Sequence, residues 1–143
     1  MRVIIDTNVL VSGIFFKGPP YSILQAWRDG LVQLVVSNSI LSEYSETTKR
    51  ISLKYPAIDI SNLLELLTIK SEVVAEKVID KKISRHQLDD KFIHCAKAGK
   101  VLIIISGDKH LLELHPYENI EILSPTVFTN RFLKKPEEEP KEE

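Results

Sequence analysis

The sequence predicts an α/β protein, a three-layer α/β/α sandwich built on a mainly parallel central sheet. Short apolar runs alternate along the chain with segments of helical spacing, which is typical of a doubly wound fold. The apolar runs are continuous, as expected for strands that are covered on both faces. The length of 143 residues, with 43% hydrophobic and 27% charged residues, fits one ordinary globular domain.

Four apolar runs are expected to form strands, at residues 3–5, 31–36, 101–105 and 120–123. A fifth candidate, at residues 73–75, lies between two polar stretches and has a weaker pattern. Helices are expected where apolar residues recur at helical spacing behind a capping residue or a proline. These segments are residues 21–28, 40–51 after Ser37-Asn38-Ser39, 58–67 with Asp59 or Ser61 as cap, 90–99 with Asp89 or Asp90 as cap, and 125–133 after Ser124.

The composition argues against several classes of protein. No apolar run reaches the roughly 18 residues that a spanning helix needs, so a membrane protein is not expected. Asp6 interrupts the apolar stretch that a signal peptide requires, which favours a cytoplasmic protein. The single cysteine, Cys95, cannot form an internal disulfide or anchor a thiolate zinc site.

The formal net charge of −1 is divided unevenly along the chain. Residues 134–143 carry three basic and five acidic groups, which leaves sixteen basic and fifteen acidic residues at positions 1–133. This last segment has no apolar residue, so it cannot bury enough surface to offset the entropy of ordering it. We therefore expect a working domain at residues 1–133 and a disordered charged tail at 134–143. A nearly neutral body does not exclude a nucleic-acid partner.

Acidic residues follow two of the predicted strands near the point where each strand ends. Asp6 comes directly after the first apolar run, and Asp108 closely follows the third. In an open α/β sheet, ligands bind beyond the carboxyl ends of the strands, so these two acids are expected at one rim. Further acids near the starts of two predicted helices can converge on the same point: Glu43, Asp89 and Asp90.

Convergent carboxylates repel one another, so this arrangement calls for a positive partner. Carboxylate oxygens suit Mg²⁺ or Mn²⁺, and the absence of a clustered Cys/His set in the sequence argues against zinc. Two such ions about 3.5–4 Å apart can activate a water and stabilise the leaving oxygen of a phosphodiester. The pattern therefore indicates metal-dependent phosphoryl or phosphodiester hydrolysis. Each acid taken singly also has a simpler interpretation, as a strand end, a solvated helix residue or a helix cap.

Four motifs occur in order along the chain: Val-Ile-Ile-Asp-Thr-Asn-Val-Leu at residues 3–10, Ser-Ile-Leu-Ser-Glu-Tyr at 39–44, Asp-Asp-Lys-Phe-Ile-His-Cys-Ala at 89–96, and Ile-Ser-Gly-Asp-Lys-His-Leu-Leu at 105–112. In this order they resemble the PIN domain nucleases, and in particular the PIN-family toxin components of toxin–antitoxin systems. The closing Leu-Ser-Pro-Thr-Val-Phe at residues 123–128 is similar to the same subgroup. The resemblance covers nearly the whole body of the chain.

The resemblance implies a parallel sheet flanked by helices and an endoribonuclease that cleaves single-stranded RNA with Mg²⁺ or Mn²⁺. It places the catalytic, metal-binding acids at Asp6, Glu43, Asp90 and Asp108. The supporting positions are Asn8 by hydrogen bonding, Ser106 by a hydroxyl near the metal site, and Asp89, which either takes part or caps the helix. It further implies a small antitoxin protein as partner and a homodimer or higher homo-oligomer.

Seven basic residues between positions 77 and 100, against three acidic ones, indicate a positive rim beside the acidic pocket. Such a rim attracts a phosphate backbone in spite of the neutral total charge. The candidate RNA contacts are Lys82, Arg85, Lys91 and Lys109. The alternative is that these side chains form a solvated surface.

The sequence leaves two other functions open beside the leading hypothesis of a metal-dependent ribonuclease. A small-molecule phosphatase of the haloacid-dehalogenase kind shares an acid after the first strand, but it needs Asp-x-Asp, and this chain has Asn8 at the third place. A non-catalytic RNA-binding or regulatory module would use the same basic rim. Against it stand the four acids, because a carboxylate-lined pocket without metal repels phosphates.

Overall fold

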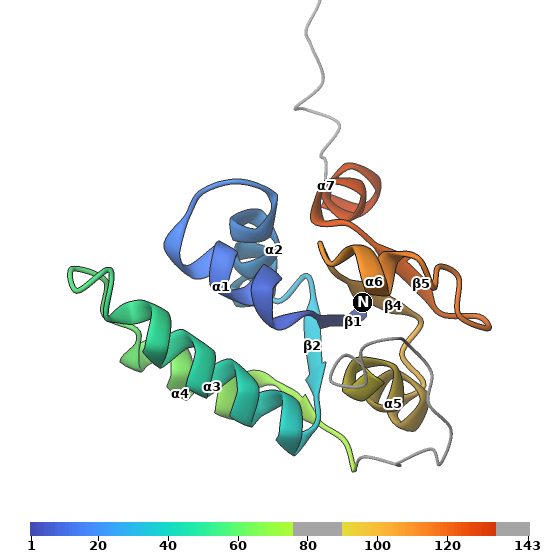
Figure 1. Ribbon diagram of the computed structural model, residues 1–143, viewed down its shortest axis with the longest axis horizontal. Coiled ribbons are helices and arrows are strands. Elements are labelled where there is room, and N and C mark those ends of the chain that lie inside the picture. The colour runs from blue at the N-terminus through green and yellow to red at the C-terminus, as the bar shows by residue number, and fades with distance from the viewer. Residues whose placement is uncertain (76–89, 134–143) are drawn as a thin grey trace, which may run out of the picture.

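Five parallel strands form the central sheet, in the order β3-β2-β1-β4-β5 (Figure 1). The computed structural model describes residues 1–75 and 90–133, and of Asp90 only the backbone. The strands are β1 Arg2–Ile5, β2 Gln33–Val36, β3 Glu72–Val73, β4 Ile103–Ile105 and β5 Glu121–Leu123. The predicted α/β class with its parallel sheet is confirmed.

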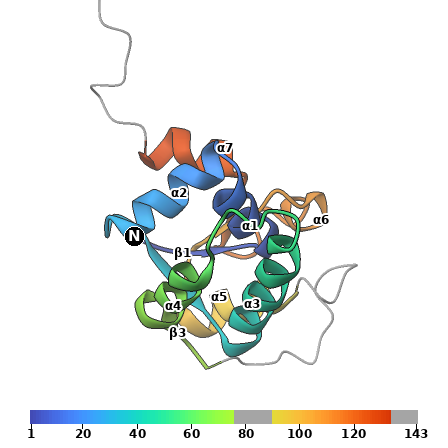
Figure 2. The same ribbon diagram turned by 90° about the vertical axis from the view of Figure 1, so that its left-hand side faces the viewer.

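Helices flank the sheet on both sides. They are α1 Thr7–Phe15, α2 Pro19–Arg28, α3 Asn38–Ser52, α4 Ser61–Lys70, α5 Asp90–Gly99, α6 Lys109–Leu112, α7 Pro125–Phe128 and a π-helical turn at Thr129–Leu133. Right-handed crossovers to the two sides of β1 place the connecting helices on opposite faces. Figure 1 shows α1 to α4 on one side of the strands and α5 on the other, where it packs against β1, β2 and β4. Figure 2 shows α7 beside α2, which it contacts.

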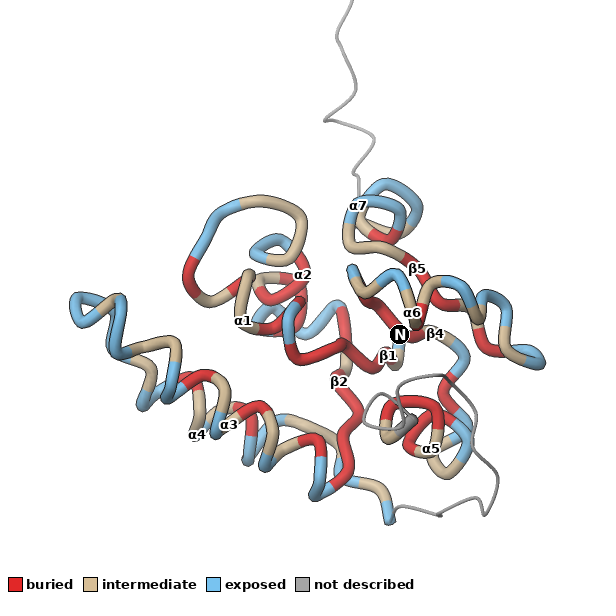
Figure 3. Tube along the Cα trace, in the orientation of Figure 1, coloured by how far each residue is buried: buried red, intermediate tan, exposed pale blue. Residues whose placement is uncertain are grey.

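The core lies between these layers and explains why the strand sequences are continuously apolar. Val3, Ile4 and Ile5 of β1 are fully buried, and Figure 3 shows the strands among the most buried parts of the chain. Each face of the central strand is therefore covered, and burial of apolar surface contributes about 25 cal/mol per Å². Within the described residues, no helix is long and apolar enough to cross a membrane.

Three expected strand boundaries are wrong by two residues. The strand expected at residues 73–75 is β3, which ends at Val73. β2 begins at Gln33 instead of residue 31, and β4 begins at Ile103 instead of residue 101. Leu31 and Leu102 are 60% and 54% exposed, so they lie outside the packed layer. An exposed leucine next to a strand lengthens the apolar run in the sequence without taking part in the sheet.

The helix expectations need corrections at α1 and α4. The helix expected at residues 58–67 is α4 at Ser61–Lys70 and lies three residues later in the chain. Helix α1, which begins directly after β1, was not predicted, because its apolar residues are not confined to one face and no side chain caps it. The cap of α4 is Ile60, which makes no side-chain bond, and the Asp59 carboxylate instead accepts hydrogen bonds from Ser61. The expected cap Asp89 and the tail at 134–143 lie outside the described residues.

Helices α1 and α2 approach each other most closely at Gly13. A Cβ atom on Gly13 would lie 2.7 Å from the Pro20 carbonyl oxygen and 2.8 Å from Leu24 Cδ1. These separations are too short for any side chain, so glycine is what allows the two helices to pack. The contact fixes α1, and α1 begins at the rim where the acids were expected.

Tyr44 links α3 to the central strand through a hydrogen bond. Its phenol is buried and donates a 2.5 Å hydrogen bond to the carbonyl oxygen of Ile5, the last residue of β1. Burial raises the pKa of Tyr44 well above its usual value of 10, and the negative charges of Asp6 and Glu43 act in the same direction. The hydrogen bond places the first turns of α3 next to the end of β1.

The substitution Tyr44→Phe is expected to lower the free energy of unfolding at neutral pH by about 1–2 kcal/mol, because it leaves the Ile5 carbonyl without its partner. Above pH 10 the unfolded chain loses the Tyr44 proton while the folded chain keeps it, so wild-type stability falls as pH rises. The free energy of unfolding of Tyr44→Phe should fall less between neutral and alkaline pH than that of the wild type, because the variant has no phenol at this position. Denaturant unfolding at several pH values measures both effects.

The control for this prediction is Tyr21→Phe, because the Tyr21 ring is exposed and its hydroxyl accepts a hydrogen bond from Gln25 on the surface. This change should alter the free energy of unfolding by less than about 0.5 kcal/mol. Equal losses in the two variants would contradict the role assigned to Tyr44.

Candidate active site at the carboxyl end of the sheet

Asp6 occupies the centre of the rim. It follows β1, which lies between β2 and β4 where the strand order reverses, and its side chain is buried. Its backbone N–H donates to the Ile105 carbonyl oxygen at 2.9 Å, which continues the pairing of β1 with β4. Although Asp6 is the N-cap residue of α1, its carboxylate makes no capping hydrogen bond. A helix cap therefore does not account for a buried acid here.

Ser106 holds the Asp6 carboxylate from the neighbouring strand. This residue follows β4, is fully buried, and donates its hydroxyl to Asp6 Oδ2 at 2.7 Å. The same Oγ accepts the backbone N–H of Asp108 at 2.9 Å. The hydroxyl is thereby oriented on both sides, and it links the ends of β1 and β4 to the turn that carries Asp108.

Asp108 is the N-cap of α6 and is partly exposed. Its Oδ1 accepts the His110 backbone N–H at 2.7 Å, so the capping interpretation of this residue is correct. Capping occupies one oxygen of the carboxylate and leaves the residue beside a cavity of about 230 Å³ between α1, α6 and α7. That cavity is lined by Asn8, Val9, Ser12, Pro20, Gly107, Asp108 and Pro125.

Glu43 reaches the site from α3, and both of its carboxylate oxygens have partners. Thr7 donates its hydroxyl to Oε2, and the Lys91 ammonium forms an ion pair with Oε1. Thr7 follows Asp6 directly, so these contacts bring Glu43 to the rim. Lys91 and Glu43 are only partly exposed, which makes the pair less screened than a surface salt bridge.

The structure describes some of the remaining predicted site residues and not others. Asp90 is the first residue of α5, one position before Lys91, and its side chain is not described. Lys109 is exposed at the start of α6, next to Asp108. The predicted residues Asp89, Lys82 and Arg85 lie outside the described residues.

The oxygen-rich donor set fits a hard divalent cation. Among the described residues, no group of three or more His, Cys, Asp and Glu side chains is close enough to hold a metal. Asp6 and Asp108 are joined through Ser106, and Glu43 lies at the same rim, whereas Asp89 and Asp90 were outside that search. Carboxylates and a hydroxyl suit Mg²⁺ or Mn²⁺ better than zinc.

Sequence reasoning did not find two contacts that hold the site together. Thr7 was not singled out, and Lys91 was assigned to an outer rim, whereas both side chains bind Glu43. The only local signal is position, since each residue directly follows a predicted acid in the chain. That signal is weak because the partners are 36 and 48 residues apart.

Comparison with known proteins gives one assignment. No curated protein matches the chain. A family model described as a PIN domain matches residues 2–110, a span that contains Asp6, Glu43, Asp90 and Asp108. PIN domains are typically metal-dependent nucleases, and the rim of this sheet carries oxygen ligands suited to that chemistry. With about three quarters of its length matched and the parallel sheet that such a domain needs, the chain belongs to the PIN domain family.

Proposed function

We propose that the protein is a metal-dependent endoribonuclease that cleaves single-stranded RNA. The observation that carries this proposal is the buried Asp6 carboxylate, which ends the central strand and is bound by Ser106 in place of a helix cap. A buried carboxylate costs several kcal/mol unless charge or hydrogen bonds compensate it. A cation at this rim supplies such compensation, and membership of the PIN domain family supports nuclease chemistry.

In the proposed mechanism, Asp6, Asp90 and Asp108 would hold a divalent metal with help from Glu43. Bound Mg²⁺ or Mn²⁺ would supply positive charge and Lewis acidity toward a water and a phosphate oxygen. Ser106 fixes the orientation of the Asp6 carboxylate, and the backbone of Asp108 is bonded to the same hydroxyl. Asn8 lines the neighbouring cavity, where its amide can position the RNA or a water.

Lys91 has a separate task in this mechanism. Its ammonium neutralises Glu43 and is held within the site by that ion pair. A cation in this place attracts the RNA phosphate and stabilises charge on it. It also reduces the negative field that repels RNA from a carboxylate cluster.

The proposal extends to a biological role. We assign the protein to the cytoplasm as the toxin of a toxin–antitoxin pair, acting as a homodimer and inhibited by a small antitoxin protein. Support for this role comes from the resemblance of the four motifs and of residues 123–128 to the toxin subgroup.

The first test is Asp6→Asn. It should reduce Mn²⁺-dependent cleavage of single-stranded RNA by about 100-fold or more, because the metal loses a ligand worth several kcal/mol to the transition state. The fold should be retained, since asparagine has the same shape and relieves repulsion among the carboxylates. Cleavage of end-labelled RNA and thermal unfolding measure the two effects. The matched control is Glu65→Gln, an exposed residue of α4.

Unchanged cleavage by a pure, folded Asp6→Asn preparation would refute the assignment of Asp6. Two further results would favour the alternative functions. Phosphate retained covalently on Asp6 would favour the phosphatase. RNA binding that is equal with metal and with chelator, without cleavage of any RNA, would favour the non-catalytic module.

The second test is Lys91→Met, which leaves Glu43 without its counter-ion. Mn²⁺ affinity measured by calorimetry should rise about two- to fivefold, because the metal no longer competes with Lys91 for Glu43. This factor corresponds to the energy of a partly exposed ion pair. The KM for RNA should rise, because the cation near the phosphate is lost. Lys97→Met is the control, since Lys97 lies on the same helix but pairs with the exposed Glu118. A fall in Mn²⁺ affinity in Lys91→Met would contradict the role given to Lys91.

The toxin role predicts that production of the wild-type chain in a bacterial host arrests growth, whereas Asp6→Asn does not. Coproduction of the product of an adjoining small reading frame should restore growth. Growth arrest of equal strength by the wild type and by Asp6→Asn would show that toxicity does not depend on the metal site. That result would contradict the proposed toxin role.

A further inference from the structure

Three aromatic side chains gather where the C-terminal end of α1 meets the segment that follows α3. The rings of Phe15 and Tyr55 stack with centroids 5.2 Å apart, and the Phe16 ring meets Tyr55 edge to face at 5.6 Å. Phe15 is buried, Tyr55 is partly exposed and Phe16 is 51% exposed. The exposed Phe16 ring, supported by Tyr55, therefore offers an aromatic face to a ligand.

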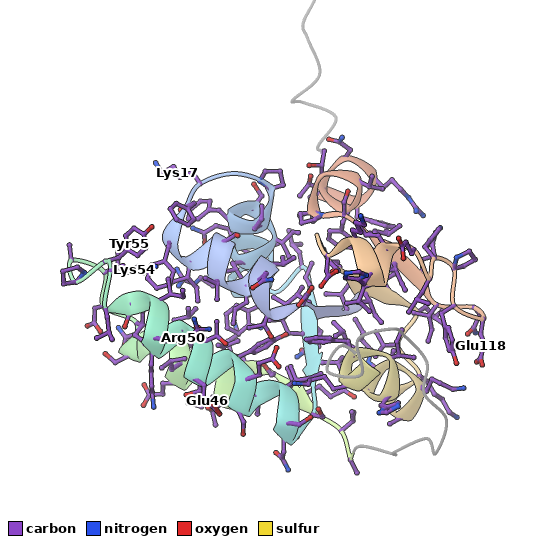
Figure 4. The ribbon with its side chains drawn as sticks, viewed as in Figure 1. Lys17, Glu46, Arg50, Lys54, Tyr55 and Glu118 are labelled. Atoms are coloured by element: carbon purple, nitrogen blue, oxygen red, sulfur yellow. The ribbon has the colours of Figure 1, made fainter. Side chains whose placement is uncertain are left out.

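Cationic side chains surround these rings. Lys17 follows Phe16 directly, Arg50 lies in the last turn of α3, and Lys54 precedes Tyr55. All three are exposed, and none forms an ion pair within the part of the chain that the structure describes. Figure 4 shows Tyr55 and Lys54 at the left of the view below Lys17, with Arg50 and then Glu46 further along α3.

The two segments that build this surface are poor in acidic residues, although the exposed Glu46 lies one helical turn before Arg50 on α3. Between Asp6 and Asp29 the chain carries two basic residues and no acid, and between Glu46 and Asp59 it carries three basic residues and no acid. A helix C-terminus favours basic residues in its last turn, which accounts for Arg50. Lys17 directly follows the C-cap residue of α1, and Lys54 directly follows the C-cap residue of α3. The C-terminal ends of two different helices therefore bring these cations to one surface.

The surface is connected to the active site by two helices. Asp6 stands at the start of α1 and Phe16 at its end, so the nine residues of the helix separate them by about 14 Å. Along α3, Glu43 and Arg50 are seven residues apart, about 10 Å. A strand of nucleic acid that occupies the site can therefore reach the aromatic rings within a few nucleotides.

We propose that Phe16, Lys17, Arg50, Lys54 and Tyr55, here called the aromatic–basic patch, bind single-stranded RNA a few nucleotides away from the bond that is cut. The proposal rests on the proposed function in that RNA is the ligand. The exposed Phe16 ring stacks on a base, and the three cations contact the phosphates. Aromatic platforms beside a positive track are a general device for binding single strands without a strict sequence.

The test measures the affinity of a fluorescently labelled 15-nucleotide single-stranded RNA by anisotropy, in a chelator buffer that prevents cleavage. Phe16→Ala should weaken binding roughly tenfold, within the range found for one stacked base. Phe16→Trp should keep the affinity because it keeps a π-face, whereas Phe16→Leu should lose it. The control is Leu31→Ala, an equally exposed apolar residue at the opposite end of the sheet.

The cations are tested together by the triple variant Lys17→Gln, Arg50→Gln, Lys54→Gln. It should reduce the slope of log affinity against log salt by about 2, since each phosphate contact contributes about 0.7 for a single strand. Arg28→Gln is the control, because Arg28 is exposed and ends α2 shortly before β2, at the far end of the sheet. Circular dichroism checks that every variant is folded.

Each outcome bears on one of the two proposals. Wild-type affinity and salt slope in the patch variants, together with Mn²⁺-dependent cleavage by the wild type, would overturn the patch alone. Weakened binding in those variants without cleavage by the wild type would keep the patch and remove the nuclease. No RNA binding by the wild type in the chelator buffer, at a salt concentration of about 50 mM, would overturn the patch. The same result together with no Mn²⁺-dependent cleavage of RNA would overturn both proposals. A dimer that Phe16→Ala dissociates, with unchanged RNA affinity, would make the patch a protein interface and refute the proposal.

Discussion

A carboxylate buried at the end of the central strand is the constraint on which the arrangement of this protein depends. Asp6 cannot be solvated where it lies, and an uncompensated buried charge costs several kcal/mol. Its neighbours supply the compensation: the Ser106 hydroxyl from the adjacent strand and the positive end of α1, which begins at the next residue. The close packing of α1 on α2 at Gly13 and the fastening of α3 by Tyr44 keep these groups in place.

The site also balances part of its own charge. Glu43 is bound on one oxygen by Thr7 and on the other by Lys91, so its charge is compensated by the protein alone. One carboxylate oxygen of Asp108 caps α6, and the residue lies next to the cavity. The acids of this rim therefore differ in how firmly the protein already holds them, although the sequence presents them as equivalent carboxylates.

Much of the fold follows from the sequence because parallel strands buried on both faces have an unmistakable composition, as Val3, Ile4 and Ile5 show. Asp6 and Asp108 were likewise predictable, since both stand near the ends of such runs. The exposure of Leu31 was not, because hydropathy does not tell which leucine reaches the core. Nor was the contact of Lys91 with Glu43, since a pairing across 48 residues depends on how α3 and α5 pack.

The link between Asp6 and Ser106 joins residues 100 positions apart in the chain. A ribosome that has completed α5 has made β1, β2 and β3 but not β4, so the carboxylate at the end of β1 has neither its hydroxyl partner nor Asp108. Local segments can fold during synthesis, but this pairing has to wait until more than two thirds of the chain is made. Sheet topology thus delays assembly of the rim, and an unfinished chain on the ribosome lacks a complete site until the turn after β4 has been made.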